Sequence, residues 1–241
     1  MKSAVSPHSK HVFSVLSYLL QSGEKLTLLI PFKGLLIAQE VRSLHIGQDH
    51  LVLQAPTHHI FTNIRDHVYL YTVQSPQGMI ANVQNLNLQR GIITLTGFKF
   101  MDSPWHDRKS ERVEPVEPLH ITLSTKNATF RGRLENLSMN GLGMLLYTKN
   151  FKNIPNKAGE IVNTRIILGE DIPPLEMRGK MVASRPIGQT LTHLGMVIKP
   201  EGLQKTLLTQ YISTRRHEIL AELEHLSNHV LEPKYSKDLY Y

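Results

Sequence analysis

The chain has 241 residues, 41% of them hydrophobic and 20% charged, which is ordinary for a globular protein of one large or two small domains. It contains no cysteine, so disulfides, thiolate metal sites and cysteine nucleophiles are excluded. Its formal net charge of +7 favours an anionic partner, which includes nucleic acid, anionic lipid, a nucleotide or an acidic protein surface.

Residues 8–22 predict a helix, because apolar side chains recur there at helical spacing and a glycine follows as a stop. These residues are Val12, Leu16, Leu19, Leu20 and Gly23. The apolar run at 12–20 is shorter than the roughly 20 residues that span a bilayer. Because polar residues follow it without a small-residue cleavage site, we expect a cytoplasmic protein with no membrane insertion.

Six β-like runs come next, separated mostly by Gly, Pro or Asn, and they predict a compact β domain over residues 1–102. The predicted strands cover residues 25–31, 34–46, 50–55, 66–73, 79–86 and 92–100. Charges and prolines replace the alternation over residues 103–118, which predicts a linker between two domains.

Six further runs predict a second domain, a small barrel or sandwich, over residues 119–228. They cover residues 119–124, 128–136, 143–147, 161–168, 175–186 and 192–198. A long helical pattern ends this domain, and we expect its apolar stripe to pack on the strands. The stripe consists of Leu203, Leu207, Leu208, Tyr211, Ile212, Ile219, Leu220 and Leu223. We expect an irregular tail at 229–241.

Two arginines in the predicted linker, Arg108 and Arg112, place two guanidinium groups on one short segment. Such groups match phosphate oxygens and the O6/N7 edge of guanine, and their planes can stack on a base. The alternative is a solvated basic linker with ion pairs to Glu111 or Glu114.

A second polar group lies where the sequence predicts a strand, a tight turn and a strand. Asn136 and Ser138 supply short polar side chains there, and Gly141 lets a flat ligand approach the backbone closely. A guanine nucleotide that carries phosphates would satisfy both this group and the arginine pair.

The pattern RxxxR, followed about two dozen residues later by [D/N]xSxxG, resembles the PilZ domain, a bacterial receptor for the second messenger cyclic di-GMP. The resemblance covers roughly residues 105–225, and the domain order is similar to the two-domain flagellar-brake (YcgR-like) group. It implies a mainly β fold of two small antiparallel β-barrel domains, an N-terminal YcgR-N-like barrel and a C-terminal PilZ barrel. An N-terminal helix and a long C-terminal helix complete this expected fold.

The resemblance also implies the roles of the site residues. Arg108 and Arg112 would clamp guanine and phosphate, while Asn136, Ser138 and Gly141 would form the floor that receives cyclic di-GMP. The residues at 193–197 resemble the late PilZ strand near the ligand, or else form a plain strand. Four arginines either flank the anion site or are ordinary exposed strand residues. They are Arg131, Arg133, Arg178 and Arg185.

One departure from the family pattern concerns stoichiometry. Asp107 stands where the family frequently has a further arginine, and its carboxylate should repel additional phosphates. We therefore predict one cyclic di-GMP per protomer. Asp107 and Glu111 also leave open a weakened or lost site.

Three functions follow from these patterns. The first is a cyclic di-GMP effector that changes its interdomain orientation on binding. The resemblance to flagellar-brake proteins implies that it regulates motility through the flagellar motor, in association with the flagellar basal body, or a related surface-lifestyle output. The second is a nucleic-acid-binding regulator, and the third is a ligand-free structural adaptor. Arg215 and Arg216 form either a partner-binding spot or a solvated helix face, and an edge strand or the terminal helix offers a route to a homodimer.

The sequence contains no GxSxG, P-loop or dinucleotide-binding motif, so we expect no enzyme. Its thirteen histidines include no HExxH pattern, and we expect no metal site.

Overall fold

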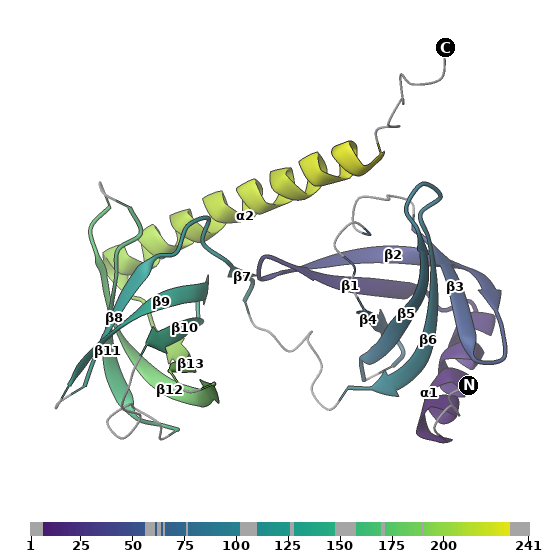
Figure 1. Cartoon of the computed structure of the whole chain (residues 1–241), viewed down its shortest axis with the longest axis horizontal. Coiled ribbons are helices and arrows are strands. Elements are labelled where there is room, and N and C mark those ends of the chain that lie inside the picture. The colour runs from purple at the N-terminus through teal and green to yellow at the C-terminus, as the bar shows by residue number, and fades with distance from the viewer. Residues whose placement is uncertain are drawn as a thin grey trace, which may run out of the picture. The chain divides into compact units, whose positions relative to one another are not determined.

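The structure is a computed structural model that describes residues 7–55, 61, 64, 66–75, 77–101, 110–125, 128–147, 158–169, 172–188 and 190–231, without the side chains of residues 7–10 and 227–231. Its chain divides into two compact units. The first unit takes in residues 1–32, 36–107 and 220–241, and the second takes in residues 33–35 and 108–219. Each unit is built around a closed ring of antiparallel strands (Figure 1).

The N-terminal part of the first unit contains one helix and six strands. They are α1 (Pro7–Gln21), β1 (Leu26–Phe32), β2 (Leu35–Ile46), β3 (His50–Gln54), β4 (His67–Thr72), β5 (Met79–Asn87) and β6 (Ile92–Phe100). The strands close into a barrel in the order β1-β2-β3-β6-β5-β4. Apolar side chains at alternate positions of each strand face the barrel interior, as at Leu26, Leu28 and Ile30 of β1, which are all buried.

Helix α1 adds its apolar face to this core. Val12 and Leu16 are fully buried, and the ring of Phe13 lies 5.1 Å from that of Phe98 on β6. The helix ends as predicted, since Gly23 adopts a φ of 87° and its amide donates to the Leu20 carbonyl at 3.1 Å.

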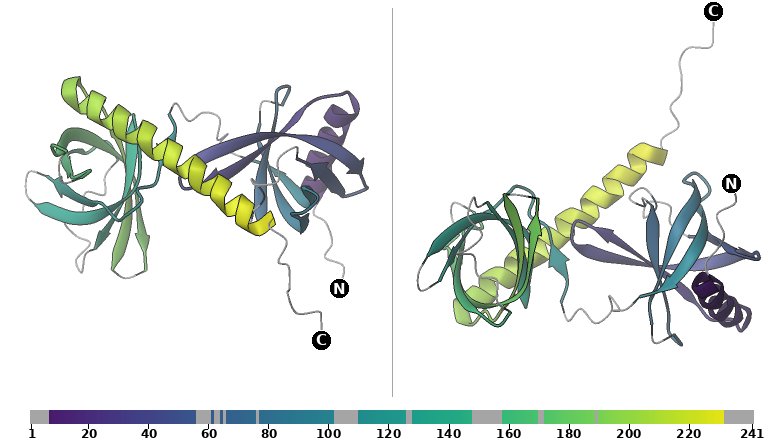
Figure 2. Two further views of the ribbon diagram at one scale, coloured as in Figure 1. Left: turned by 90° about the horizontal axis from the view of Figure 1, so that it is seen from above. Right: turned by 60° about the horizontal axis from the view of Figure 1, so that its bottom comes forward.

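The second unit contains seven strands and the long helix up to Ile219. The elements are β7 (Arg112–Val113), β8 (His120–Ser124), β9 (Thr129–Ser138), β10 (Gly141–Tyr147), β11 (Ile161–Ile166), β12 (Leu175–Ile187), β13 (Leu191–Ile198) and α2 (Gly202–Leu231). The sheet order is β10-β13-β12-β11-β8-β9-β7, and pairing of β10 with β9 closes six strands into a ring (Figure 2, right). Strand β7 lies outside the ring and pairs with β9 alone among the described strands.

The mainly β fold with two antiparallel barrels and two helices is confirmed, and every predicted strand is present within a few residues of its expected bounds. The two-residue strand β7 was not predicted, because Pro115 and Pro118 and the surrounding charges hide it. Helix α2 extends to Leu231, two residues past His229, where the irregular tail was expected to begin.

The apolar stripe of α2 is partly as predicted. Leu208, Ile212, Ile219 and Leu223 are buried, whereas Leu203 is 66% exposed and does not belong to the packed face. Neither helix in the described part of the chain combines the length and apolar character that crossing a membrane requires.

Candidate ligand-binding site

The tight turn between β9 and β10 brings Ser138 and Gly141 together. The Ser138 hydroxyl donates a hydrogen bond to the Gly141 carbonyl oxygen at 2.9 Å, and the two residues are paired across the strands. A Cβ atom on Gly141 would lie 2.8 Å from the Met196 carbonyl oxygen, so a larger residue would push β13 away. Barrel packing alone therefore requires glycine at this position, beyond any role in admitting a ligand.

Strand β7 places Arg112 directly opposite Ser138. The other residue of β7, Val113, pairs with Leu137 and is fully buried in the barrel core. Because successive residues of a strand face opposite sides, burial of Val113 turns the Arg112 side chain outward. Arg112 is exposed and makes no ion pair with any described residue.

Arg108, the other predicted clamp residue, lies outside the described residues, as does Asp107. The structure thus brings together four of the five predicted site residues. Arg112, Ser138 and Gly141 share one row across β7, β9 and β10, and Asn136 lies in the next row.

The strand registers define two further rows on the outer face of the barrel. The first is Asn136, Gly143, Gly195 and Ala183, from β9, β10, β13 and β12. We call this row the glycine floor, because its two central residues have no side chain. The next row is Arg133, Leu145, His193 and Arg185, and it borders the glycine floor on the side away from Arg112.

The Asn136 side chain is the polar group that borders this floor. Its Nδ2 would lie 2.8 Å from a Cβ on Gly143, so glycine at 143 leaves the space that the carboxamide occupies. Its Oδ1 is buried and has no hydrogen-bond partner among the described residues. A buried polar atom without a partner is costly, so a rotation of this carboxamide toward a donor on a ligand would be favourable.

An ion pair lies beside the glycine floor, on the side away from Arg112. His193 Nε2 lies 3.1 Å from Glu135 Oε2, and these residues come from β13 and β9, on either side of β10. Leu145 of β10 points outward between them and is only 9% exposed. The predicted late strand at 193–197 is therefore part of β13 and borders the site.

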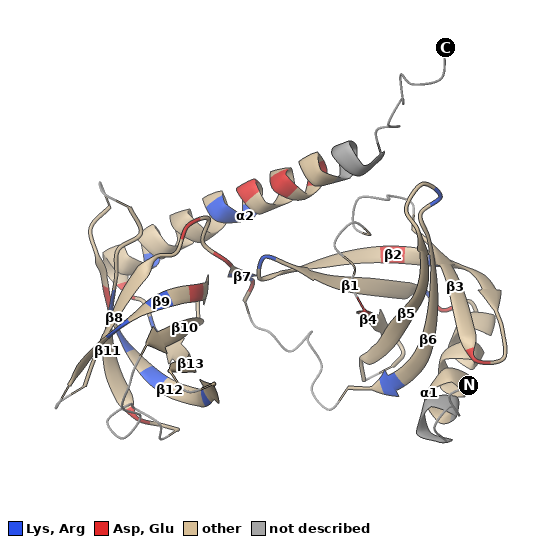
Figure 3. Cartoon of the chain, in the orientation of Figure 1, with Lys and Arg blue, Asp and Glu red and all other residues tan. Residues whose placement is uncertain are grey.

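Basic residues surround this face, as the blue segments of β9 and β12 in Figure 3 illustrate. Arg133 and Arg185 belong to the row beside the floor. Arg131 lies further along β9 opposite Thr122, and Arg178 lies opposite Asn163, away from the floor. Two of the four arginines that were considered as flanking residues thus lie next to the site.

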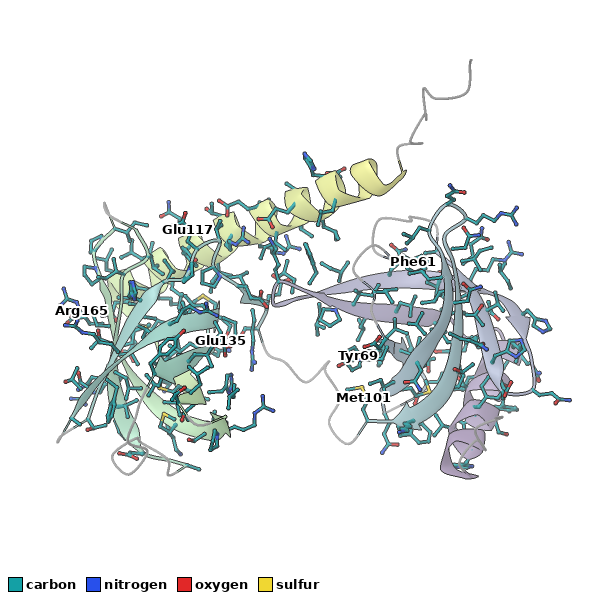
Figure 4. All side chains as sticks on the ribbon, viewed as in Figure 1. Phe61, Tyr69, Met101, Glu117, Glu135 and Arg165 are labelled. Atoms are coloured by element: carbon teal, nitrogen blue, oxygen red, sulfur yellow. The ribbon has the colours of Figure 1, made fainter. Side chains whose placement is uncertain are left out.

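A pocket of about 320 Å³ opens next to Asn136, between residues 114–118 and the β9 residues 133–136. Glu117 and Glu135, labelled in Figure 4, line it together with Glu114. Glu114 is exposed as a whole residue, but its carboxyl group is partly desolvated, and this desolvation raises the pKa of the carboxyl above its usual value. Three carboxyl groups outnumber the one guanidinium among the lining residues, that of Arg133, so phosphate should prefer the Arg112 side.

The C-terminal helix contacts the segment that carries Arg112. Arg216 Nε lies 3.0 Å from Glu111 Oε2, and Arg215 Nε donates to the Glu114 carbonyl oxygen at 2.7 Å. The expectation that Arg215 forms part of an exposed basic spot is wrong, because it is 2% exposed. It occupies the buried stripe of α2 between Ile212 and Ile219, and that spacing is the sequence signal that could have identified it.

Within the described residues, no three His, Asp or Glu side chains come close enough to hold a metal ion. A larger pocket, of about 790 Å³, lies in the first unit between α1 and the Gln48-Asp49 turn, and the described residues that line it include no lysine or arginine.

The second unit also matches a known family. The family model of the PilZ domain matches residues 106–213, a range that takes in all five predicted site residues. This part of the chain is therefore a PilZ domain, and the resemblance noted in the sequence is confirmed. No curated protein sequence matches the chain.

Three solved structures are similar to most of the chain. Escherichia coli YcgR, in complex with c-di-GMP, is 17% identical, with 89% of this chain and 93% of that chain covered and a TM-score of 0.46. The K. pneumonia MrkH–c-di-GMP complex is 10% identical, with coverage of 89% and 95% and a TM-score of 0.45. The Bacillus subtilis inhibitor of motility MotI/DgrA is 14% identical, with coverage of 81% and 96% and a TM-score of 0.41.

Proposed function

We propose that this protein is a receptor for cyclic di-GMP, which binds on the outer face of the PilZ barrel. The observation that carries the proposal is the direct pairing of Arg112 with Ser138, next to Gly141 and to Asn136, whose Oδ1 has no hydrogen-bond partner in the described part of the chain. Arg112 provides a guanidinium that has no ion-pair partner among the described residues and suits phosphate or guanine, and the glycine floor accepts a flat base. The protein acts by binding and not by catalysis.

The ligand chemistry fits this arrangement. Cyclic di-GMP carries two phosphates and two guanines, and each charge-assisted hydrogen bond to it contributes roughly 1.5–3 kcal/mol. A few such bonds suffice for a Kd of about 1 μM, which corresponds to roughly 8 kcal/mol, after the cost of ordering the arginines. Arg108 is the second clamp residue in this proposal.

Isothermal titration calorimetry of the full chain with cyclic di-GMP tests the proposal. We expect saturable binding with one ligand per protomer, because Asp107 adds a negative charge beside the clamp and disfavours a second pair of phosphates. Cyclic di-AMP, which lacks the guanine O6 acceptor, is the control ligand and should bind more weakly. A 2:1 ratio of ligand to protein would contradict the stoichiometry, and no binding would contradict the function.

The cellular output that we propose is regulation of motility. Binding draws Arg108 and Arg112 onto the ligand and so changes the orientation between the two units, and the ordered form engages the flagellar motor. We place this protein in the cytoplasm, at the flagellar basal body, and its homodimer stays a prediction. Cells with raised cyclic di-GMP should swim less when they express the wild-type chain than when they express Arg112→Ala.

Equal swimming with both chains would argue against this output. The net charge of +7 supports a second output, binding of nucleic acid. Titration with duplex DNA separates the two, because DNA binding that requires cyclic di-GMP and weakens steeply with salt would identify a transcriptional regulator.

A further inference from the structure

Two consecutive residues of α2 contact the clamp segment, which we define as residues 111–114. Arg216 contacts the Glu111 carboxylate at 3.0 Å, and Arg215 contacts the Glu114 main-chain carbonyl at 2.7 Å. Arg112 lies between these two contact points. The helix therefore holds the segment on both sides of the residue that is expected to bind phosphate.

The hydrogen bond from Arg215 to the clamp segment comes from a buried, charged donor. A buried guanidinium is costly unless its donors are satisfied, and Arg215 also donates through Nη1 to Glu218 Oε2 at 3.0 Å. Because its acceptor on the segment is a main-chain oxygen, the bond fixes the path of the backbone itself. Val113, buried between the two contact points, gives the segment its register on β9.

Arg216 has a different effect. Without it, the Glu111 carboxylate would be an unpaired negative charge one residue from Arg112, where it would attract that guanidinium and repel phosphate. The 3.0 Å ion pair with Arg216 holds the carboxylate toward the helix. Arg112 is thus left available for an anion.

We propose that Arg215 and Arg216 are positioning residues for the nucleotide site, and that docking of α2 on the barrel and affinity for the nucleotide are coupled. The affinity part rests on the proposed function, whereas the fastening of the segment does not. Coupling is reciprocal, so a partner that pulls α2 from the barrel would weaken nucleotide binding, and bound nucleotide would hold α2 in place.

Amide hydrogen exchange without nucleotide tests the fastening. In Arg215→Met, which keeps the bulk of the side chain but removes its donors, amides of residues 111–113 should exchange at least about tenfold faster, whereas those of β11 and β12 should not change. Arg165→Met is the matched control, since it removes an exposed arginine that pairs with Glu176 on the β11–β12 face. Unchanged exchange at residues 111–113 would overturn the proposal.

Titration with cyclic di-GMP tests the coupling. Arg215→Met should weaken cyclic di-GMP binding at least about fivefold. Arg216→Met should weaken it by roughly two- to fivefold, because the ion pair of Arg216 with Glu111 is more exposed and exposed pairs contribute less. Adding Glu111→Gln to Arg216→Met should restore affinity, which a merely structural role would not predict. Wild-type affinity in both single variants would refute the coupling.

Two further outcomes keep these tests separate. If the wild-type chain does not bind the nucleotide, the proposed function fails, and the exchange experiment still decides whether α2 fastens the segment. If Arg215→Met does not fold, Arg215→Lys replaces it, because a lysine retains the charge but not the planar fork. Arg215→Lys should show intermediate exchange, and wild-type exchange in that variant would count against the proposal.

Discussion

Replacing Arg112 with alanine should weaken cyclic di-GMP binding at least about a hundredfold. A guanidinium fork donates two charge-assisted hydrogen bonds of roughly 1.5–3 kcal/mol each, and about 1.4 kcal/mol corresponds to a tenfold change in Kd. The side chain is exposed and has no ion-pair partner among the described residues, so its loss should leave the barrel intact. Calorimetry measures the affinity, and the thermal midpoint should shift by no more than about 2 °C.

The control for this variant is Arg165→Ala, which removes the same charge from the same barrel. Arg165 lies on β11, far from Glu135 at the site (Figure 4). The Arg165→Ala variant should therefore bind the ligand as the wild type does. If both variants lost affinity equally, general charge rather than the clamp would explain binding. If Arg112→Ala bound as tightly as the wild type, the clamp assignment would be wrong. We expect Arg108→Ala to behave like Arg112→Ala.

Placing a valine on the glycine floor should also abolish most of the binding. A Cβ at Gly195 would meet its nearest neighbour, the Cβ of Ala183, at 3.4 Å, which is an ordinary contact, so Gly195→Val should fold. Valine also suits a strand better than glycine does. Its methyl groups would stand where a flat base rests, and we expect affinity to fall at least about tenfold from this overlap.

Thr122→Val serves as the matched control for the floor variant. Thr122 lies on β8, which is not part of the floor, and the substitution introduces the same side chain. Fluorescence or calorimetric titration of both variants should separate them, with Thr122→Val close to wild type. Should Gly195→Val retain full affinity at an unchanged thermal midpoint, the ligand does not rest on this face of the barrel.

Much of the site could be predicted from the sequence because it depends on residue type and local spacing. The turn from Ser138 to Gly141 is encoded within a few residues, and the alternation of apolar side chains specifies which face of each strand is buried. Arg112 was identified by its spacing from Arg108, although its strand was not. A two-residue strand has no periodicity of its own, and only pairing with Ser138 and Leu137 defines β7.

Other features of the site depend on contacts between distant parts of the chain. Gly195 lies beside Gly143 only because β13 pairs with β10 in that register, and Glu135 meets His193 across the same strand. The bulge that places Glu135 there is a shift in the pairing of β9 and β10. The spacing of residues in the sequence does not reveal which residues pair with each other across neighbouring strands.

The amino-acid sequence by itself determined where twelve of the thirteen described strands and the two helices lie along the chain, their grouping into two β domains, and the polar groups that suit a guanine nucleotide. Those properties follow from short-range periodicity, turn residues and side-chain chemistry. Only the tertiary structure decided that the buried Arg215 holds the backbone at Glu114, about a hundred residues away in the sequence. The same arginine reads as a surface charge in the sequence, because the acceptor that makes its burial favourable lies on another element.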